Sequence, residues 1–202
     1  MNNVTFAPVQ TDQPSHLMPV FGRQQISFVR GQGSYLYTAD GTEYFDALTG
    51  IAVCGLGHSH PAVTEAIVDQ ASTLIHTSNL FEVPWQTAAA QKLAKVAGME
   101  EVFFSNSGAE SNEGAIKIAR KFGHMQGVAN PKIIVADHSV HGRTMATLSA
   151  TGNKKVQEGF GPLVEGFIRV PFGDIEAIEE AAINHPDIVA ILVEPIQGEG
   201  GV

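Results

Sequence analysis

The sequence predicts an α/β fold with a mainly parallel sheet, and three observations lead to this class. Two short runs rich in β-branched residues, 132–136 and 188–194, are bounded by turn residues and show no polar alternation. Such runs are typical of parallel strands that are buried on both faces. A helical pattern after Asp174 lies between them, and a further strand predicted over 101–105 leads directly into a helix. Strands that alternate with helices in this way favour a parallel sheet covered by helices.

The chain begins with a segment that lacks a clear period. Residues 1–20 contain Asn, Gln, Pro and Ser, which predicts an N-terminal arm that becomes ordered against another surface, such as that of a partner. Over 26–48, short apolar and aromatic stretches flank the turn residues Asp40 and Gly41. A β-hairpin is therefore predicted here.

Two helices are predicted after the hairpin. Apolar residues recur at helical spacing over 61–75, and the proline at the start of this segment suits the first position of a helix. The second helix is predicted over 84–97, with Gly98 as its C-terminal cap. Its residues Leu93 and Val96 are expected to face inward.

The predicted strand 101–105 passes through a short polar turn into a helix over 109–122. This helix has apolar residues at helical spacing, namely Ala115, Ile116, Ala119 and Phe122. Segment 151–166 is rich in Gly, Lys and Glu and is predicted to be a loop beside the sheet.

Composition limits the kind of protein and its partners. With 202 residues, of which 44% are apolar and 16% charged, the chain can bury a substantial core. Its formal net charge of −9 argues against nucleic acid and membrane surfaces as partners, because both attract clustered Lys and Arg. No apolar run is long enough to suggest a membrane span. A single cysteine and the lack of a secretory signal pattern favour a cytoplasmic protein that binds small molecules.

The clearest candidate site is the turn over 105–110, between a predicted strand and a predicted helix. Small residues at a helix start leave backbone N–H groups free to face an anion such as a phosphate, and Gly108 permits a close approach. Ser and Asn are also common helix caps, so this turn taken alone favours the cap over the phosphate site.

Charged residues follow two of the predicted strands. Arg143 comes after 132–136 and can bind a carboxylate through two parallel hydrogen bonds, or it can pair with an acidic residue of the chain. Glu194 and Glu199 come at the end of 188–194, where open α/β sheets bind ligands. Either glutamate could balance a cation, and a polar glycine turn is the alternative.

The two histidines His58 and His60 do not predict a metal site. Structural and catalytic metal sites need three or four ligands, and the chain has one cysteine, Cys54, and neither a CxxC nor an HExxH motif. We therefore expect no metal, and we expect these histidines to satisfy backbone groups at the start of the helix 61–75. Cys54 stands in an apolar stretch and is expected to be a buried, inert thiol.

Several short words in order along nearly the whole chain carry a family resemblance. They are DGTEYFD (40–46), GIAV (50–53), LGHSHP (56–61), HTSNLF (76–81), NSGAESNE (106–113), IKIAR (116–120), HGRT (141–144) and EPIQGEGG (194–201). Taken together, these words show that the chain resembles the class III aminotransferases, which use pyridoxal 5'-phosphate. HTSNLF, HGRTMATLSATGN (141–153) and EPIQGEGG look most like the acetylornithine branch of that family.

The resemblance implies a fold-type I transferase and an activity. Residues 1–55 would be an arm and hairpin that belong to a small domain, and residues 56–202 would be an incomplete large domain that binds the cofactor. The whole protein would be a cytoplasmic homodimer in arginine biosynthesis that moves an amino group from N-acetylornithine, or a related ω-amine, to 2-oxoglutarate.

Other functions stay open beside this one. Within the family, 4-aminobutyrate and succinylornithine aminotransferases share the same arginine and glutamates. From another class, a non-catalytic phosphate-binding or assembly module would keep the anion site without chemistry. A sugar or nucleotide enzyme is not favoured, because neither GxxxxGK[ST] nor GxGxxG occurs.

The resemblance also implies roles for single residues at the cofactor. Gly108 and Ala109 would donate backbone N–H bonds to the cofactor phosphate, with Ser107 beside them. Val140 and Glu194 would lie near the cofactor ring.

Three residues match substrate positions of the family. Arg143 would bind the substrate α-carboxylate, and Glu199 would pair with a later arginine and move when 2-oxoglutarate binds. Ile51 matches a pocket position where ornithine δ-aminotransferases have tyrosine, so it argues against free ornithine as the donor.

The chain departs from the family pattern in two places. The family usually has Phe or Tyr at Val140, so the cofactor ring would lose aromatic stacking. The aspartate that pairs with the pyridine nitrogen and the Schiff-base lysine are expected beyond Val202. We therefore expect no catalytic residue of this kind in the chain, which by itself would be an inactive N-terminal fragment.

Overall fold

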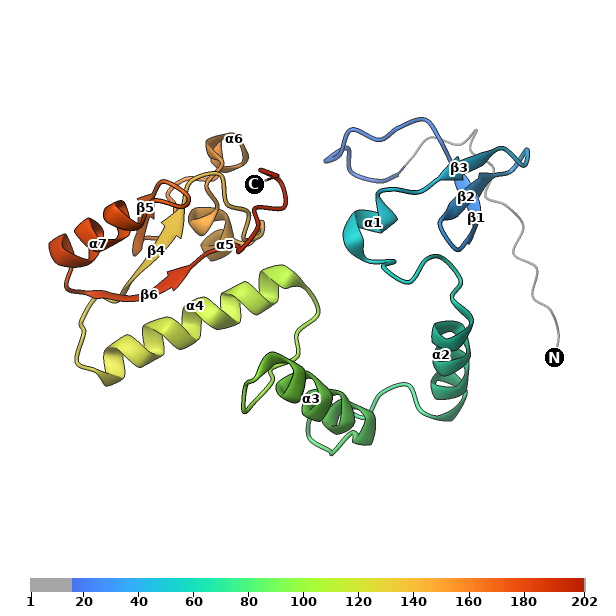
Figure 1. The fold of residues 1–202 in the computed structure, drawn as a ribbon, viewed down its shortest axis with the longest axis horizontal. Helices are drawn as coiled ribbons and strands as arrows, with labels where there is room; N and C mark the ends of the chain where they lie inside the picture. The colour runs from blue at the N-terminus through green and yellow to red at the C-terminus, as the bar shows by residue number, and fades with distance from the viewer. Residues whose placement is uncertain (1–15, 202) are drawn as a thin grey trace. The chain divides into compact units, whose positions relative to one another are not determined.

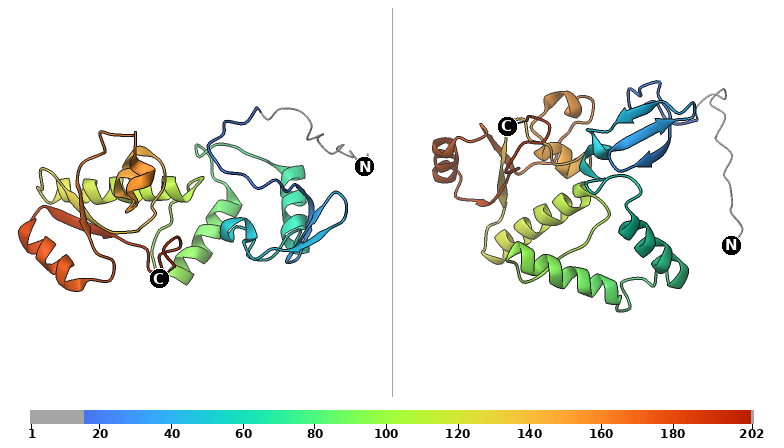
Figure 2. Two further views of the ribbon diagram at one scale, coloured as in Figure 1. Left: turned by 90° about the horizontal axis from the view of Figure 1, so that it is seen from above. Right: turned by 45° about the vertical axis from the view of Figure 1, so that its right-hand side comes forward.

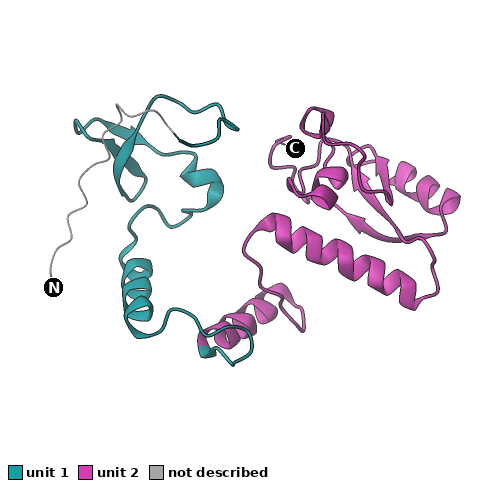
Figure 3. Ribbon diagram, turned by 180° about the vertical axis from the view of Figure 1, so that it is seen from behind, with its two compact units in different colours: residues 1–84 teal, residues 85–202 magenta. Residues whose placement is uncertain are grey.

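The structure, a computed structural model, describes residues 16–201. The chain divides into two compact units, which we call the first unit (residues 1–84) and the second unit (residues 85–202) (Figure 3). Residues 1–15 of the predicted N-terminal arm lie outside the described residues, and residues 16–27 contain no helix or strand. The predicted boundary between a small and a large domain at residues 55 and 56 stays a prediction about the whole protein.

The first unit contains a small antiparallel sheet. Its strands, in the order β1-β2-β3, are β1 (Phe28–Gln32), β2 (Tyr35–Thr38) and β3 (Glu43–Phe45) (Figure 1). The predicted hairpin is formed by β2 and β3, with Tyr35 opposite Phe45. Gly41 has a φ of 87° and Asp40 accepts the Thr42 N–H at 3.1 Å, as the turn requires. The sequence predicted one hairpin over 26–48 and did not predict β1 as a separate strand before it.

Three helices follow this sheet along the chain: α1 (Thr49–Ala52), α2 (Pro61–Thr73) and α3 (Pro84–Ala97). The two predicted helices are confirmed, and α2 ends two residues earlier than predicted. Neither α2 nor α3 has a buried residue. The prediction that Leu93 and Val96 face inward is therefore wrong for the described chain, where Val96 is 87% exposed. The spacing of apolar residues predicts which face of a helix is apolar, but it does not show which other segment covers that face.

The second unit confirms the predicted α/β class. Its strands β4 (Lys132–Ala136), β5 (Phe167–Val170) and β6 (Ile188–Leu192) form a parallel sheet in the order β5-β4-β6. Helices α4 (Gly108–Met125) and α7 (Ile175–Asn184) cover its two faces (Figure 1, Figure 2).

The core of the second unit explains why the central strand reads as a continuous apolar run. Ile133 and Val135 of β4 pack with Ile116 of α4 on one face. Ile134 packs with Ala181 of α7 on the other face. Because successive side chains of a strand point to opposite faces, a strand covered on both sides is apolar at every buried position, here 133–136.

The helices of the second unit start where side chains cap them. Ser107 accepts the Glu110 N–H and begins α4, which is longer than the predicted 109–122. Asp174 accepts the Ala177 N–H at 2.9 Å and begins α7, as predicted. Two shorter helices are α5 (Met145–Ala150) and α6 (Lys154–Gln157). Among the described residues, no helix is both long and apolar enough to cross a membrane.

Three local predictions are wrong, and two short elements were not predicted. Segment 101–105 is not a strand, because an apolar run also needs a pairing partner and none is present within the described residues; Phe103 is 74% exposed. The predicted loop 151–166 contains α6, and the helix α5 before it was not predicted. The strand β5 was missed, since its charged Arg169 interrupts a short apolar run. Cys54 is half-buried rather than buried.

Candidate functional site

The loop that follows β4 meets the start of α4 at the carboxyl edge of the parallel sheet. A Cβ added to Gly142 would lie 2.8 Å from the Cβ of Ala109 and 2.5 Å from Oγ1 of Thr147, so a glycine is needed for this approach. The Asn112 side-chain amide donates to the His141 carbonyl at 2.8 Å. The structure therefore brings the predicted phosphate turn and the His-Gly-Arg segment together.

The N-terminus of α4 combines a cap with free donors. Ser107 Oγ accepts the Glu110 N–H at 3.2 Å, and the Glu110 carboxylate accepts the Asn106 N–H at 2.9 Å, so the turn is a helix cap. Within residues 16–201, however, the N–H groups of Gly108 and Ala109 donate no hydrogen bond. A Cβ added to Gly108 would meet nothing within 4 Å. Two donors of the first helical turn therefore remain available to an anion.

Glu194 ties the loop after β4 to the end of β6. Its Oε2 accepts the Val140 N–H at 2.9 Å, and its Oε1 accepts the Gly198 N–H at 3.4 Å. Glu194 and Val140 are both half-buried. The neighbouring His141 is buried, and its Nε2 has no partner within the described residues. Burial lowers the pKa of His141, which Arg169 also lowers, whereas Glu194 opposes the shift.

Arg143 projects from this loop into solvent. Its guanidinium contacts only the carbonyl of the adjacent Gly142, at 3.5 Å, and forms no ion pair with any described residue. The next residue fixes the backbone, because the Thr144 N–H donates to Thr147 Oγ1 at 3.1 Å and the Thr144 hydroxyl donates to the Glu113 carboxylate. The alternative in which Arg143 pairs with an acid of this chain is therefore not formed in residues 16–201.

Glu199 is exposed and borders an open cavity of about 610 Å³ at the same edge of the sheet. The cavity is also lined by Gly200 next to Glu199 and by residues that follow β4 or surround the start of α6, namely Asp137, His138, Gly152, Asn153, Lys154 and Lys155. Sequence reasoning singled out Glu199 but not the two lysines. The short helix α6 brings the two lysines to the cavity that Glu199 borders. Because 151–166 was predicted to be a loop, the sequence did not indicate where these lysines lie.

Arg169 is a further residue that sequence reasoning missed. Arg169 is exposed as a whole residue, yet its guanidinium donates to the carbonyls of Ala136 at 3.1 Å, Ser149 at 3.2 Å, Ala150 at 3.3 Å and Thr151 at 3.0 Å. Burial lowers the pKa of this guanidinium, and Asp137 opposes the shift. The one available signal was a charge inside a strand that is otherwise apolar. These bonds join β5 to the end of α5 and so close the loop that carries Val140 and Arg143.

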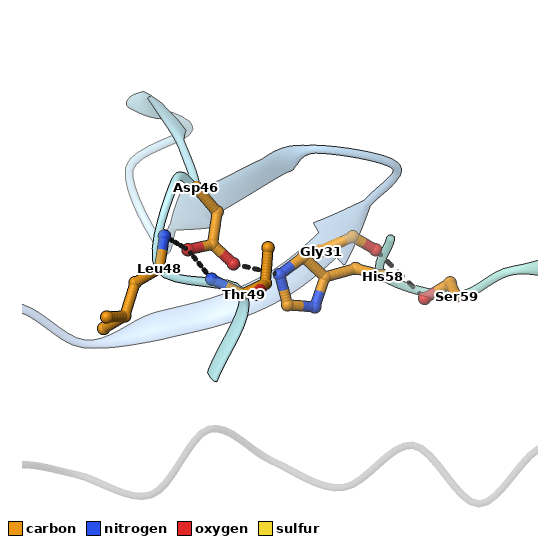
Figure 4. Close-up of polar contacts among 6 residues, drawn as sticks. All are labelled: Gly31, Asp46, Leu48, Thr49, His58 and Ser59. Carbon is orange, nitrogen blue, oxygen red and sulfur yellow. Dashed lines mark hydrogen bonds and ion pairs between the residues drawn. The ribbon is translucent and has the colours of Figure 1, made fainter. Parts of the chain in front are cut away.

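Ile51, the remaining predicted site residue, belongs to the first unit. It lies in α1, where Thr49, Gly50, Ile51 and Ala52 have φ values of 52°, 66°, 61° and 63°. Its side chain is 81% exposed. The loop that contains it runs between Asp46 and His58, and Oδ2 of Asp46 lies 2.6 Å from Nε2 of His58 (Figure 4).

Comparison with known proteins decides the family. The model of the family "Aminotransferase class-III" matches residues 20–202. The chain belongs to the class-III aminotransferases. It is 54% identical over 188 residues to acetylornithine aminotransferase from Nitrosomonas europaea, covering 93% of this chain and 48% of that protein. The chain therefore spans about half the length of the curated relatives that it matches.

Solved structures agree with this assignment. The ornithine aminotransferase from Toxoplasma gondii superposes with a TM-score of 0.87 at 33% identity, covering 93% of this chain and 45% of that one. Acetylornithine aminotransferase from Elizabethkingia anophelis gives a TM-score of 0.76 at 34% identity, covering 93% and 43%. The predicted class III membership and the predicted fold-type I architecture are thus confirmed.

The residues at the start of α4 fit a phosphate-bearing cofactor. The free N–H groups of Gly108 and Ala109 and the open space beside Gly108 suit a phosphate. Val140 lies on the loop that packs against this helix start, and Glu194, which follows β6, accepts the Val140 N–H. The cofactor and substrate roles of these residues remain predictions, as do those of Ser107, Arg143, Glu199 and Ile51.

The histidines of the first unit are not used as predicted. His58 Nε2 pairs with Asp46 rather than with backbone at the start of α2, and Ser59 Oγ donates to the Gly31 carbonyl at 3.0 Å (Figure 4). His60 precedes α2 without a side-chain capping bond. In the part of the chain that the structure describes, no three His, Cys, Asp or Glu side chains gather as a metal site would need.

Proposed function

We propose that the protein encoded by the complete reading frame containing this chain transfers the terminal amino group of N-acetylornithine to 2-oxoglutarate, with pyridoxal 5'-phosphate as its cofactor. One observation carries the proposal. Ala109, at the start of α4 where two N–H groups are free, packs against Gly142, which directly precedes the unpaired Arg143. A site for a phosphate and a cation for a carboxylate therefore occupy the same edge of the sheet.

The cofactor assignment rests on the chain's own donors. The N–H groups of Gly108 and Ala109, together with the positive end of the α4 dipole, would bind the phosphate. Val140 would cover one face of the ring, and Glu194 would hold the Val140 backbone in place through its 2.9 Å bond. When bound, the cofactor would supply an electron sink for the reaction. An ornithine aminotransferase from Toxoplasma gondii, a structural neighbour, is described with this cofactor at its active site.

The substrate assignment rests on Arg143. A guanidinium binds a carboxylate through a planar pair of hydrogen bonds, and that of Arg143 is exposed and unpaired among the described residues. It would orient the donor by its α-carboxylate, which leaves the terminal amine to reach the cofactor. Glu199 would pair with an arginine outside this chain and move when 2-oxoglutarate replaces the donor.

The choice of donor rests on the relatives and on Ile51. The curated relatives with identities of 54% and 50% are named acetylornithine aminotransferases. An aliphatic side chain at Ile51 offers no hydrogen bond to a free α-amino group, so it favours the N-acetylated donor. The corresponding setting is arginine biosynthesis by a cytoplasmic homodimer.

A transamination assay tests the proposal. The complete reading frame is expressed, and 2-oxoglutarate-dependent turnover is compared for N-acetylornithine, N-succinylornithine, 4-aminobutyrate and ornithine. N-acetylornithine is expected to give the highest kcat/KM. A preference for 4-aminobutyrate or succinylornithine would correct the donor. A protein that binds the cofactor phosphate without turnover of any donor would instead be a non-catalytic module.

A further inference from the structure

The turn that contains Ile51 has a backbone conformation that residues other than glycine rarely adopt. Four consecutive residues, Thr49 to Ala52, have positive φ, and only one of them is glycine. Ile51 itself has φ 61° and ψ 62°. Left-handed conformations are least accessible to β-branched residues such as Thr and Ile, so something outside the turn must hold it.

Apolar packing within the described residues does not hold this turn. Ile51 and Val53 are each 81% exposed, and Leu48 is also exposed. Within the turn, the N–H groups of Ile51 and Ala52 donate to the Leu48 carbonyl at 2.9 and 3.2 Å. The side-chain restraint comes from a carboxylate. Oδ1 of Asp46 accepts the Leu48 N–H at 3.0 Å and the Thr49 N–H at 2.9 Å, which fixes the first residues of the turn (Figure 4).

The other oxygen of Asp46 reaches the far end of the loop. Oδ2 lies 2.6 Å from Nε2 of His58, and the two side chains are only 7% and 20% exposed. His58 is anchored in turn to the segment after β1, because its N–H donates to the Gly33 carbonyl at 2.7 Å and its carbonyl accepts the Gly33 N–H at 3.0 Å. A single pair of side chains therefore closes the loop 47–57 against the sheet of the first unit.

We propose that Asp46 and His58 are positioning residues that set the choice of amino donor by fixing the left-handed turn Thr49–Ala52 and, with it, the Ile51 side chain. The inference rests on the proposed function, in which Ile51 lines the donor pocket. Neither Asp46 nor His58 needs to touch the donor. An aliphatic side chain held in one place can accept an apolar acetyl group and leave a free ammonium group without a partner, whereas a mobile one discriminates less.

The charge of Asp46 agrees with this role. The pKa of Asp46 is lowered, chiefly by the hydrogen bond from His58 and then by the Thr49 N–H. The carboxylate is thus the form that the loop stabilises, and a neutral amide is a suitable probe of the pair.

The test compares variants of the protein from the complete reading frame. Asp46→Asn keeps an oxygen acceptor but loses the charge, and His58→Gln loses the imidazole. For each, kcat/KM is measured with N-acetylornithine and with ornithine. Loss of one charge-assisted bond is expected to lower the ratio of the two values roughly tenfold, mainly through N-acetylornithine. The double variant should lower it no further, since both residues act through one contact.

Asp40→Asn is the matched control. Asp40 also accepts a backbone N–H in a turn of the first unit, from Thr42 at 3.1 Å, and its pKa is also lowered, first by the Thr38 hydroxyl. Its turn joins β2 to β3 and is not part of the loop 47–57. The donor ratio of this variant is expected to equal that of the unmodified protein.

Hydrogen exchange supplies a readout that does not depend on turnover. Amides of residues 48–57 should exchange faster in Asp46→Asn and His58→Gln, and at an unchanged rate in Asp40→Asn. An unchanged ratio of the two kcat/KM values, or equal losses for both donors, would overturn the inference. The proposed function would still stand in that case, provided that the unmodified protein turns over N-acetylornithine. Absence of that turnover would refute the proposed function, and unchanged exchange would refute the positioning role by itself.

Discussion

The backbone N–H of Val140 donates a 2.9 Å hydrogen bond to Oε2 of Glu194, which lies 54 residues further along the chain. This bond joins the loop after β4 to the segment after β6. Parallel strands deliver their following loops to one edge of the sheet, and here that edge collects the residues to which the sequence assigns a cofactor and a substrate.

The first prediction concerns this bond. Glu194→Ala is expected to lower the free energy of unfolding of the complete protein by about 1–3 kcal/mol, because a half-buried N–H loses its partner. Glu194→Gln keeps an acceptor and should lower it by less. Urea unfolding followed by circular dichroism measures both, with the exposed Glu199→Ala as the control. Equal losses of unfolding free energy in Glu194→Ala and Glu194→Gln would show that the hydrogen-bond acceptor at Glu194 does not contribute to stability.

The second prediction concerns the aliphatic residue at the cofactor ring. Val140→Phe is expected to tighten cofactor binding by about 0.5–1.5 kcal/mol, since an aromatic ring can stack on the cofactor. Fluorescence titration of the complete protein with pyridoxal phosphate measures the Kd. Val96→Phe, at an exposed position of α3, should leave it unchanged. Weaker binding by Val140→Phe would mean that the loop has no room for the ring.

The third prediction concerns Gly152, where the loop returns to the end of β4. Its N–H donates to the Ser139 carbonyl at 2.8 Å, and an added Cβ would lie 2.4 Å from the His138 nitrogen and 2.7 Å from the Ala136 oxygen. Because backbone atoms cannot move aside as a side chain can, Gly152→Ala should cost roughly 1–3 kcal/mol or more of stability. Gly22→Ala, where nothing lies within 4 Å, is the control for thermal unfolding. Equal melting temperatures would contradict the close approach.

The sequence predicts elements well where the signal is local. The start of α2 at Pro61 and the start of α7 after Asp174 follow from proline geometry and side-chain capping. The run 132–136 identifies β4 because burial on both faces leaves no polar residue over 133–136. Segment 101–105 has the same appearance but lacks a partner strand in the described chain. Pairing is a property of two segments, and one segment does not reveal it.

At the candidate site, too, local features could be predicted from the sequence and contacts between distant segments could not. The turn 105–110 and Arg143 could be singled out because the residue types themselves carry the chemistry. The contacts of Arg169 with four carbonyls and of Asp46 with His58 could not, since each joins segments that are distant in the chain. A charge in a strand or a histidine in a loop has too many possible partners for spacing to select one.

The fourth prediction concerns the 202-residue chain on its own. Exposed apolar side chains such as Phe103, Leu80 and Val96, and helices α2 and α3 without buried residues, should cause it to self-associate. Added pyridoxal phosphate should give no absorbance beyond that of scattered surface lysines. Analytical ultracentrifugation and borohydride trapping with peptide mapping check both points. A sharply unfolding monomer, or one lysine labelled stoichiometrically, would contradict this expectation.

The last prediction separates two roles for Arg143 in the complete protein. Arg143→Lys keeps the charge but replaces a planar fork by a point charge on a flexible stem. Loss of one charge-assisted hydrogen bond is worth roughly 1.5–3 kcal/mol, so kcat/KM for N-acetylornithine should fall on the order of ten- to a hundredfold. Most of this loss should appear in KM, with the spectrum of the bound cofactor nearly unchanged.

An amine that lacks the α-carboxylate is the control substrate for Arg143→Lys. If the guanidinium binds the carboxylate, turnover of this amine is indifferent to the substitution. If Arg143 instead pairs with an acid in the complete protein, the substitution lowers the melting temperature and affects all donors alike. The exposed guanidinium, without an ion pair among residues 16–201, favours the first outcome. Equal losses for both amines would exclude Arg143 as the carboxylate-binding residue.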